Sequence, residues 1–311
     1  ARASIFSVIV IPTKTIHAMY VRFCPDGGLK PLEREKHKAQ KVEWSFVLTY
    51  CLVVVEIQPI YIKTQRGRFD LFESLQVFEY KYNDIIVISS KFVSMSEGSI
   101  IKLSKVKVRK KAKELAIKNQ MDAKLAELVV RESEYVIKGV PGFLLAIRDG
   151  MIAPNAGIDK SNVPRGYAIL YPRDPFEIAE KLKLKFLAEL GKRVGIVIAD
   201  SRLIPTRIGT TGVAIASAGF EPVEDQRGRR DLFGNVLRVT FKGVADALAT
   251  MGVAVMGESD ESTPAAVVRG ANVIWSDKKF SWKDMAVEPL QDIYLRGNLT
   301  NIREMIFNRP A

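Results

Sequence analysis

Residues 174–200, "DPFEIAEKLKLKFLAELGKRVGIVIAD", contain the clearest helix and one of the clearest buried strands of this 311-residue chain. Asp174 stands at the N-cap position, Pro175 at the first helical position and Gly191 just beyond the last turn, an arrangement typical of helix ends. The run "VGIVIAD" then has no polar residue before its final aspartate, so it predicts a strand buried on both faces. A helix that leads directly into a buried strand favours an architecture of mixed strands and helices.

Other stretches show the same mixture. The runs "LVVVEI" (52–57) and "DIIVISS" (84–90) predict buried strands. Residues 209–219, "GTTGVAIASAG", are rich in glycine and alanine, which allows close packing against a neighbouring backbone. Further expected elements are a helix within 68–78, one or two helices within 112–138, a hairpin with an Asp149-Gly150 turn within 142–154, a strand and helix within 238–258, and a final strand at 265–270. We predict an α+β, or mixed α/β, fold with mixed sheets.

Composition limits the chemistry that the chain can perform. The net charge of +12 favours anionic partners, although the charge is spread along the sequence. The two cysteines, Cys24 and Cys51, have no metal or disulfide spacing, which indicates a reducing compartment. The two histidines, His17 and His37, lie near the N-terminus and exclude a histidine triad or histidine metal site in the main body. A metal there would have oxygen ligands, which suits Mg²⁺ or Mn²⁺.

Three regions are expected along the chain. Residues 1–50 are an extension of unclear role, 51–275 form the main domain, and 276–311 form a C-terminal tail. The longest apolar run, residues 45–57, is too short to span a bilayer, and the N-terminus lacks the layout of a signal peptide. We therefore expect a soluble, cytoplasmic protein without a membrane partner.

A basic run raises the alternative of a nucleic-acid-binding protein. Residues 102–113, "KLSKVKVRKKAK", hold seven cations and no acid. The run lacks interleaved aromatic residues for base stacking, so a solvated face is the simpler interpretation. Binding to DNA or RNA would be sensitive to salt.

Four polar clusters each follow an expected strand, where functional sites often form. They are "ISSKFVSMSEG" (88–98), "NAGIDKSNV" (155–163), "IADSRLIPTRIGTTG" (198–212) and "MGESDESTP" (256–264). Each cluster has a simpler structural interpretation as a turn, a helix cap or a solvated loop.

Individual residues in these clusters have the chemistry of a phosphate or metal site. Asp200 ends an apolar run, where a carboxylate is costly unless it is paired, hydrogen-bonded or metal-bound, and Ser201 adds a neutral oxygen. Asp159 and Asn162 lie three positions apart, so in a turn their side chains could converge on one cation or on a metal bound to phosphate. Further candidates are the hydroxyls of Ser89, Ser90 and Ser94, which could contact phosphate, and the acidic side chains of Glu258 and Asp260. The chain has no Walker A motif.

These clusters, together with "RRDLFGN", "VADALA" and "AAVVRG", occur in the order seen in the coenzyme F-420 γ-glutamyl ligases. The chain resembles that family over residues 52–272. The resemblance implies an unusual α+β fold, an intertwined homodimer with nucleotide and metals near the subunit interface, and GTP-dependent addition of L-glutamate to the deazaflavin precursor of coenzyme F-420. GTP, Mg²⁺ or Mn²⁺, and K⁺ are the implied cofactors, and no nucleic-acid partner is expected.

The resemblance also assigns roles to residues. Asp159 matches a metal ligand, Asn162 a nucleotide contact, and Asp200 with Ser201 a second metal pair in which serine replaces threonine. Arg207 is a candidate for receiving the anionic substrates. The implied nucleotide loops hold Ile57, Gln58, Pro59 and Ile60; then Ser89, Ser90 and Ser94; then Gly257, Glu258 and Ser259, with Glu258 also a metal ligand.

The chain departs from the family pattern at three places. The first nucleotide loop reads "IQPI" (57–60) instead of containing glycine, Met95 replaces a lysine, and "SRLIPTRIG" (201–209) replaces a glycine- and arginine-rich segment. These differences leave open a ligase that uses another amino acid, another acceptor or another nucleotide base.

Overall fold

The computed structural model describes residues 6–10, 53–63, 67–288 and 291–294. It divides into two compact units, Ser7–Val55 and the remainder, Ala1–Phe6 with Glu56–Ala311. In the first unit, the strand β1 (Phe6–Val10) is the main described element. Both histidines and both cysteines lie outside the described residues.

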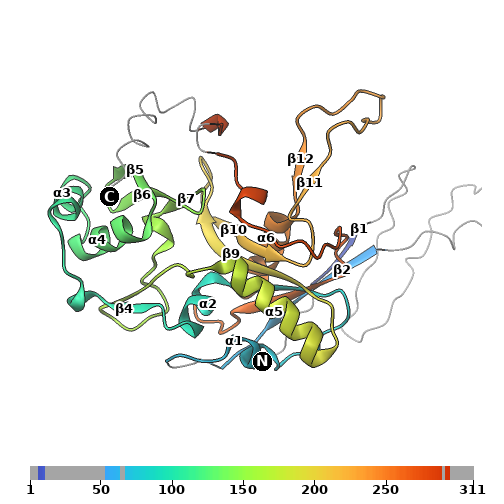
Figure 1. Cartoon of the computed structure of the whole chain (residues 1–311), viewed down its shortest axis with the longest axis horizontal. Coiled ribbons are helices and arrows are strands. Elements are labelled where there is room, and N and C mark those ends of the chain that lie inside the picture. Colours follow the sequence, from blue (N-terminus) through green and yellow to red (C-terminus); the bar gives the residue numbers. More distant parts are fainter. Residues whose placement is uncertain (1–5, 11–52, 64–66, 289–290, 295–311) are drawn as a thin grey trace, which may run out of the picture. The chain divides into compact units, whose positions relative to one another are not determined.

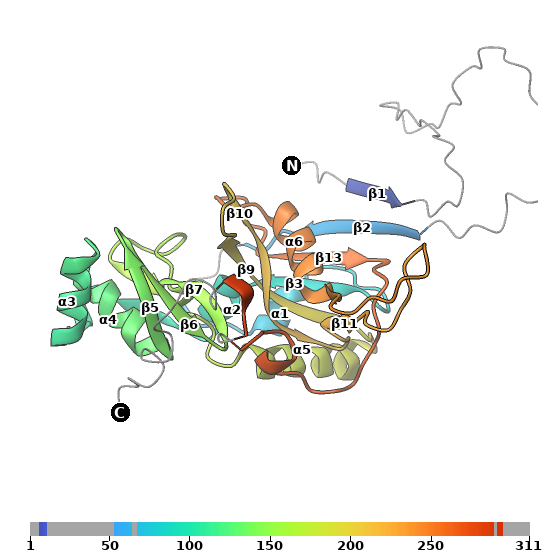
Figure 2. The same cartoon turned by 90° about the horizontal axis from the view of Figure 1, so that it is seen from above.

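The larger unit is built on a mixed sheet, in which five strands run in the order β2-β13-β3-β9-β10 (Figures 1 and 2). Strands β3 and β9 pair in parallel, and the other neighbouring pairs are antiparallel. The bounds are β2 (Val53–Ile60), β3 (Ile85–Ser89), β9 (Gly195–Leu203), β10 (Thr210–Ala218) and β13 (Ala265–Arg269). The predicted mixed α/β architecture is confirmed.

Two helices cover opposite faces of this sheet: α5 (Pro175–Leu190) lies on one face and α6 (Val244–Met256) on the other (Figure 2). Successive strand residues point to opposite faces, so Ile86 shares a hydrophobic core with α5 while Val87 contacts α6 at Gly252. The predicted helix ends are confirmed, because Asp174 caps α5 and Gly191 follows it with φ 61°.

A second group of elements, with a hydrophobic core of its own, follows β3 in the chain. The short helix α2 (Ser90–Ser96) leads into a region whose hydrophobic core is formed by two helices and a three-stranded sheet. Its elements are β4 (Ile100–Lys102), the 3₁₀ turn η2 (Leu103–Lys105), α3 (Lys110–Lys118), α4 (Ala123–Glu132), β5 (Tyr135–Val140), β6 (Phe143–Arg148), β7 (Met151–Pro154), η3 (Asn155–Gly157) and β8 (Tyr167–Ile169). The hairpin predicted at Asp149-Gly150 is confirmed by positive φ angles of 48° and 69°.

Two sequence expectations are wrong in extent. The helical interpretation of 112–138 fails after Glu132, because Tyr135–Val140 pairs with β6 as strand β5. The helix expected within 68–78 is only α1 (Leu71–Leu75), capped by Asp70. In both cases aromatic and aliphatic residues that the helical spacing assigned to a helix instead belong to a strand or pack in the core outside a helix. Tertiary packing therefore outweighs the local helical spacing.

The basic run 102–113 has a partly structural role. Glu127 of α4 is fully buried and accepts hydrogen bonds from the backbone and Nε of Arg109 and from Nε of Arg131. The six lysines of the run are exposed. This arrangement favours the interpretation of the run as a solvated face.

The last part of the unit adds an arm and a strap. The arm, residues 223–243, extends from the short pair β11 (Val223–Asp225) and β12 (Phe241–Gly243) (Figure 1). The strap, residues 275–288, includes the 3₁₀ turn η4 (Trp282–Asp284) and returns to the sheet, where Trp275 forms a bridge with Phe220. Across the described part of the chain, no helix has the length and apolar character needed to cross a bilayer.

Candidate functional site

A cavity of about 240 Å³ lies where β3 and β9 approach α2 and the end of α6. Segments that are far apart in the sequence meet there. The first set of lining residues lies at or just beyond the ends of β2 and β3: Ile62, Lys63, Ser89, Lys91, Phe92 and Met95. The remainder are Asn162, Ala199, Asp200, Ser201, Val253, Met256 and the loop 257–264. All four polar clusters of the sequence therefore contribute to one cavity.

Asp200 is the most constrained acid of the cavity. Its Oδ1 accepts a hydrogen bond of 3.0 Å from Ser90 Oγ, and its Oδ2 lies 3.0 Å from Nε of Arg202. The two side chains share one face of the strand, because residues two apart in a strand point the same way. Burial acts to lower the pKa of the Arg202 guanidinium, but the Asp200 carboxylate outweighs it and raises that pKa.

The expectation that Asp200 ends its strand is wrong. Strand β9 continues to Leu203, and Asp200 pairs in register with Val213 of β10. Its neighbour Ser201 pairs with Gly212 and so faces the α6 side of the sheet. Rigid strand geometry, not a loop, therefore holds both residues at the cavity.

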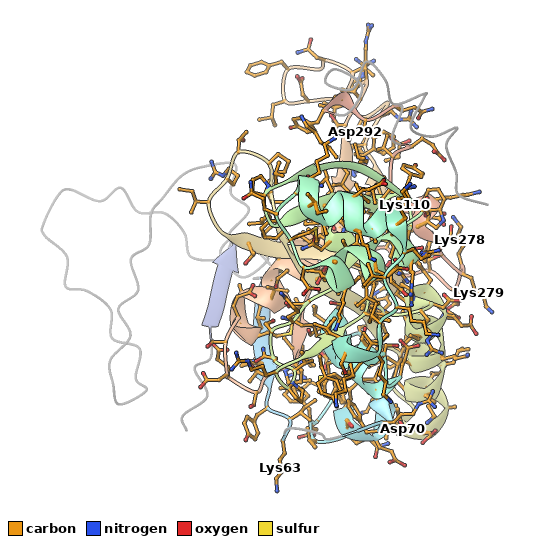
Figure 3. The ribbon with its side chains drawn as sticks, turned by 90° about the vertical axis from the view of Figure 1, so that its left-hand side faces the viewer. Lys63, Asp70, Lys110, Lys278, Lys279 and Asp292 are labelled. Carbon is orange, nitrogen blue, oxygen red and sulfur yellow. The ribbon has the colours of Figure 1, made fainter. Side chains whose placement is uncertain are left out.

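Lys91 supplies the cation on the other side of the cavity. Its Nζ lies 3.0 Å from Oδ2 of Asp159 and 3.0 Å from Oγ of Ser161. Partial burial acts to raise the pKa of Asp159, but hydrogen bonds from Ser161 and Lys91 outweigh it and lower that pKa. Lys63 lies at the rim and points outward into solvent (Figure 3). Lys91 is thus the better held of the two cavity lysines.

The loop 257–264 closes the cavity through contacts to neighbouring segments. Asn162 Nδ2 donates to the carbonyl of Ser259 at 3.1 Å, and Thr210 Oγ1 donates to Glu258 Oε1 at 3.0 Å. Within the loop, Glu261 Oε2 accepts from the backbone N–H of Ser259. Asn162 and Ser259, both predicted from sequence, are therefore in contact, and the third predicted residue, Glu258, is held through Thr210.

Comparison with known proteins agrees with this geometry. The sequence model of the F420-0:gamma-glutamyl ligase family matches residues 70–270, more than half of the chain. The chain belongs to this family. A coenzyme F420:L-glutamate ligase of Methanopyrus kandleri is 36% identical over 222 residues, which cover 70% of this chain and 88% of that protein. The protein of the same name from Methanocaldococcus jannaschii is 37% identical over 213 residues, covering 68% and 85%.

The segment "IQPI" (57–60), which the family resemblance assigns to the first nucleotide loop, does not lie in a loop. Residues Ile57–Ile60 belong to β2 and pair with β13, and Ile57 and Ile60 are buried. The expectation of a loop at "IQPI" is therefore wrong, because backbone pairing to Ala265–Arg269 fixes these residues as a strand. Ile62 and Lys63, which follow the strand, line the cavity in their place.

Four further candidates do not line the cavity. Asp159 and Ser90 lie behind it and form hydrogen bonds with the lining residues Lys91 and Asp200, whereas in the described part of the chain Ser94 and Arg207 make no such contact. Ser94 is fully buried within α2 and does not line the cavity. Arg207 is exposed in the turn between β9 and β10, where its backbone N–H donates to Ile204. The arginine beside Asp200 is Arg202, and the alternation "DSR" (200–202) was the sequence signal that could have identified it.

The family implies a divalent metal, and the donor set fits one that binds together with a nucleotide. Within residues 53–63, 67–288 and 291–294, no three His, Cys, Asp or Glu side chains are grouped as a metal cage. The cavity instead has four carboxylates and two lysines in its lining, with serine and threonine hydroxyls. Mg²⁺ is commonly held by one or two carboxylates plus phosphate oxygens, which is the chemistry these oxygen donors offer.

Proposed function

We propose that the chain is a GTP-dependent ligase that adds L-glutamate to the carboxylate of F420-0. The observation that supports this most directly is the convergence of Asp200, Lys91, Asn162 and the loop 257–264 on one cavity. The name of the family model supports F420-0 as the acceptor, and the names of the two relatives support L-glutamate as the amino acid.

Amide formation from a carboxylate requires an activated acyl group. In the proposed reaction the F420-0 carboxylate attacks the γ-phosphorus of GTP, the bond to the β-phosphate oxygen breaks, and GDP leaves. The amine of L-glutamate then attacks the acyl phosphate, phosphate departs, and the nitrogen loses a proton. This scheme needs no side-chain nucleophile, so it suits a cavity whose polar lining consists of acids, amines, amides and hydroxyls.

Charge complementarity assigns roles to the cavity residues. Lys91 would offset charge on the transferring phosphoryl group, and Asn162 would contact the nucleotide. Asp200, Ser201 and Glu258 of the lining, together with Asp159 beside Lys91, are the residues that would hold Mg²⁺ or Mn²⁺. The metal, when bound, would neutralise phosphate charge in a cavity that otherwise has more carboxylates than cations.

Phosphate release tests the proposal. Purified protein would be incubated with GTP, Mg²⁺ or Mn²⁺, L-glutamate and F420-0, with and without K⁺, and with ATP or other amino acids as substitutes. We expect release that needs both glutamate and F420-0 and a product heavier by one glutamyl residue. Turnover only with another amino acid, acceptor or nucleotide would identify a different ligase, and absence of nucleotide binding would refute the proposal.

Replacement of Lys91 by methionine should weaken GTP binding. Loss of a charge-assisted contact to phosphate is expected to raise the GTP Kd by about 10- to 100-fold, while the similar length of methionine preserves packing. Calorimetric titration of GTP with metal would measure the change. The matched control is Lys181→Met, because Lys181 is 71% exposed on α5, pairs with Glu177 and belongs neither to the cavity lining nor to its loop. Equal GTP affinity in wild type and Lys91→Met would contradict the role of Lys91.

We also propose that the chain forms a homodimer through the arm 223–243. Leu232, Phe233 and Val239 of the arm are 101%, 91% and 83% exposed. Exposed apolar side chains gathered on one segment are typical of a protein contact. Charged residues such as Arg227 and Asp225 accompany them and form an ion pair within the arm.

The double substitution Leu232→Asp/Phe233→Asp should convert the dimer into a monomer. Two carboxylates placed in an apolar contact would have to be desolvated without partners, which opposes association. Sedimentation equilibrium would measure the mass, with Leu184→Asp on the exposed side of α5 as the control. A wild-type monomer, or a double variant that remains dimeric, would exclude this contact.

A further inference from the structure

A second and larger cavity lies beside the first. This groove, of about 950 Å³, is bounded by the β5–β7 sheet, the β9–β10 hairpin and the strap near Met285–Val287. Its lining is mostly apolar and includes Val140, Phe143, Met151, Ile152, Leu203 and Val287. A cavity of this size with a mostly apolar lining suits a large organic ligand.

Arg202 connects the groove with the nucleotide cavity. It lines the groove, whereas its ion-pair partner Asp200 lines the smaller cavity. The two cavities are therefore adjacent across a single ion pair of 3.0 Å. A ligand in the groove could place one end next to a nucleotide in the smaller cavity.

The guanidinium of Arg202 also has an unused donor. The side chain is 7% exposed; Nε contacts Asp200, and Nη1 donates to the Ile152 carbonyl at 3.3 Å. Nη2 is buried without an acceptor at hydrogen-bond distance, and the neighbouring Tyr171 hydroxyl, which helps to raise the pKa of Arg202, does not fill that place. A buried charged donor without an acceptor is costly, so an anionic ligand atom would relieve that cost.

The other charged groups of the groove differ from Arg202 in their surroundings. Lys138, Asp246 and Asp292 also line it. Lys138 and Asp246 are exposed, and Asp246 Oδ1 already accepts a hydrogen bond from the backbone N–H of Ala214. Arg202 is thus the buried cation at the inner end of an apolar surface.

We propose that the groove binds the acceptor, F420-0, with its aromatic ring system against the apolar lining and its carboxylate at Arg202. This assignment rests on the proposed ligase function. The free Nη2 of Arg202 can donate a charge-assisted hydrogen bond to a carboxylate oxygen, and the carboxylate would then lie next to Asp200, where phosphoryl transfer takes place. Arg202 is in this assignment a substrate-binding and positioning residue.

The test measures F420-0 and GTP binding separately. Val140 is 56% exposed in the groove, so Val140→Trp would fill it without entering the nucleotide cavity. Arg202→Lys keeps a positive charge beside Asp200 and removes the guanidinium fork. The matched control is Val77→Trp, because Val77 is 64% exposed and lines neither cavity.

Titration of F420-0 should show a Kd at least tenfold higher in Val140→Trp and Arg202→Lys than in wild type. Titration of GTP should show a Kd within twofold of wild type in Val140→Trp and Val77→Trp. In steady-state assays Val140→Trp should raise KM for F420-0 and leave KM for GTP unchanged. If wild type converts F420-0 and both groove variants bind F420-0 as tightly as wild type does, the groove assignment is wrong while the proposed function stands. A changed oligomeric state in Val140→Trp with unchanged F420-0 affinity would assign the groove to a contact between copies. If wild type neither binds nor converts F420-0, the proposed function fails and the groove assignment fails with it.

Discussion

Asp200→Asn is expected to lower kcat/KM by about 10³-fold or more, the scale seen when one preorganised electrostatic group is removed from an active site. Asparagine has nearly the same shape and can still accept the hydrogen bond from Ser90 Oγ. It lacks the negative charge that would hold a metal and that offsets the buried Arg202 guanidinium. The effect should therefore fall on turnover and on metal-dependent GTP binding.

The same substitution should also reduce stability, so the loss of activity needs a matched control. An unpaired buried charge typically costs about 3–5 kcal/mol. Asp84 offers that control, because it is fully buried and pairs with Arg269 at 2.8 Å, as Asp200 pairs with Arg202. Asp84 precedes β3, whereas Ser89, at the other end of that strand, lines the cavity.

Asp84→Asn should therefore lower the urea midpoint by an amount comparable to Asp200→Asn and keep kcat/KM within about threefold of wild type, since no interaction of the cavity is lost. Activity would be measured well below both unfolding midpoints. Equal loss of activity in the two variants would mean that Asp200 acts only through stability. Full activity in folded Asp200→Asn would remove it from the proposed mechanism.

Local signals in the sequence were sufficient for elements whose ends are fixed by their own residues. The helix between Asp174 and Gly191 and the turn at Asp149-Gly150 are both confirmed. In each case the deciding interaction joins residues only a few positions apart. Such interactions require particular residue types that can be recognised in the sequence, namely a capping oxygen, a proline or a residue that tolerates positive φ.

Contacts between distant segments could not be predicted in this way. Residues 57–60 form a strand because Ala265–Arg269 lies beside them, and nothing within "IQPI" indicates that neighbour. Lys91 was missed because its role depends on Asp159, which is 68 positions away. The four polar clusters were found, whereas their meeting in one cavity depended on the order of strands in the sheet.

Gly212 lies in a stretch of sequence that predicted close backbone packing, and the structure shows which backbone it packs against. The glycine- and alanine-rich stretch 209–219 predicted close backbone packing, and Gly212 of β10 indeed lies directly against α6. Thr250 Oγ1 donates a hydrogen bond of 2.9 Å to the Gly212 carbonyl, which ties the helix to the strand. A Cβ atom at Gly212 would lie 2.3 Å from the backbone oxygen of Ala249. Because the atoms that this Cβ would meet belong to the backbone of α6, rotating a side chain cannot relieve the clash.

Gly212→Ala should therefore destabilise the protein by about 3 kcal/mol, at the upper end of the usual cost of overpacking. Urea unfolding followed by tryptophan fluorescence would measure the loss. The control is Gly243→Ala, because a Cβ at Gly243 would meet Asp246 Oδ2 at an ordinary 3.6 Å. Gly212 also pairs with Ser201, so movement of α6 should weaken metal-dependent GTP binding in Gly212→Ala before the protein unfolds. Equal stability of the two variants would show that α6 can shift freely from β10, and the rigid placement of Ser201 at the cavity would then be wrong.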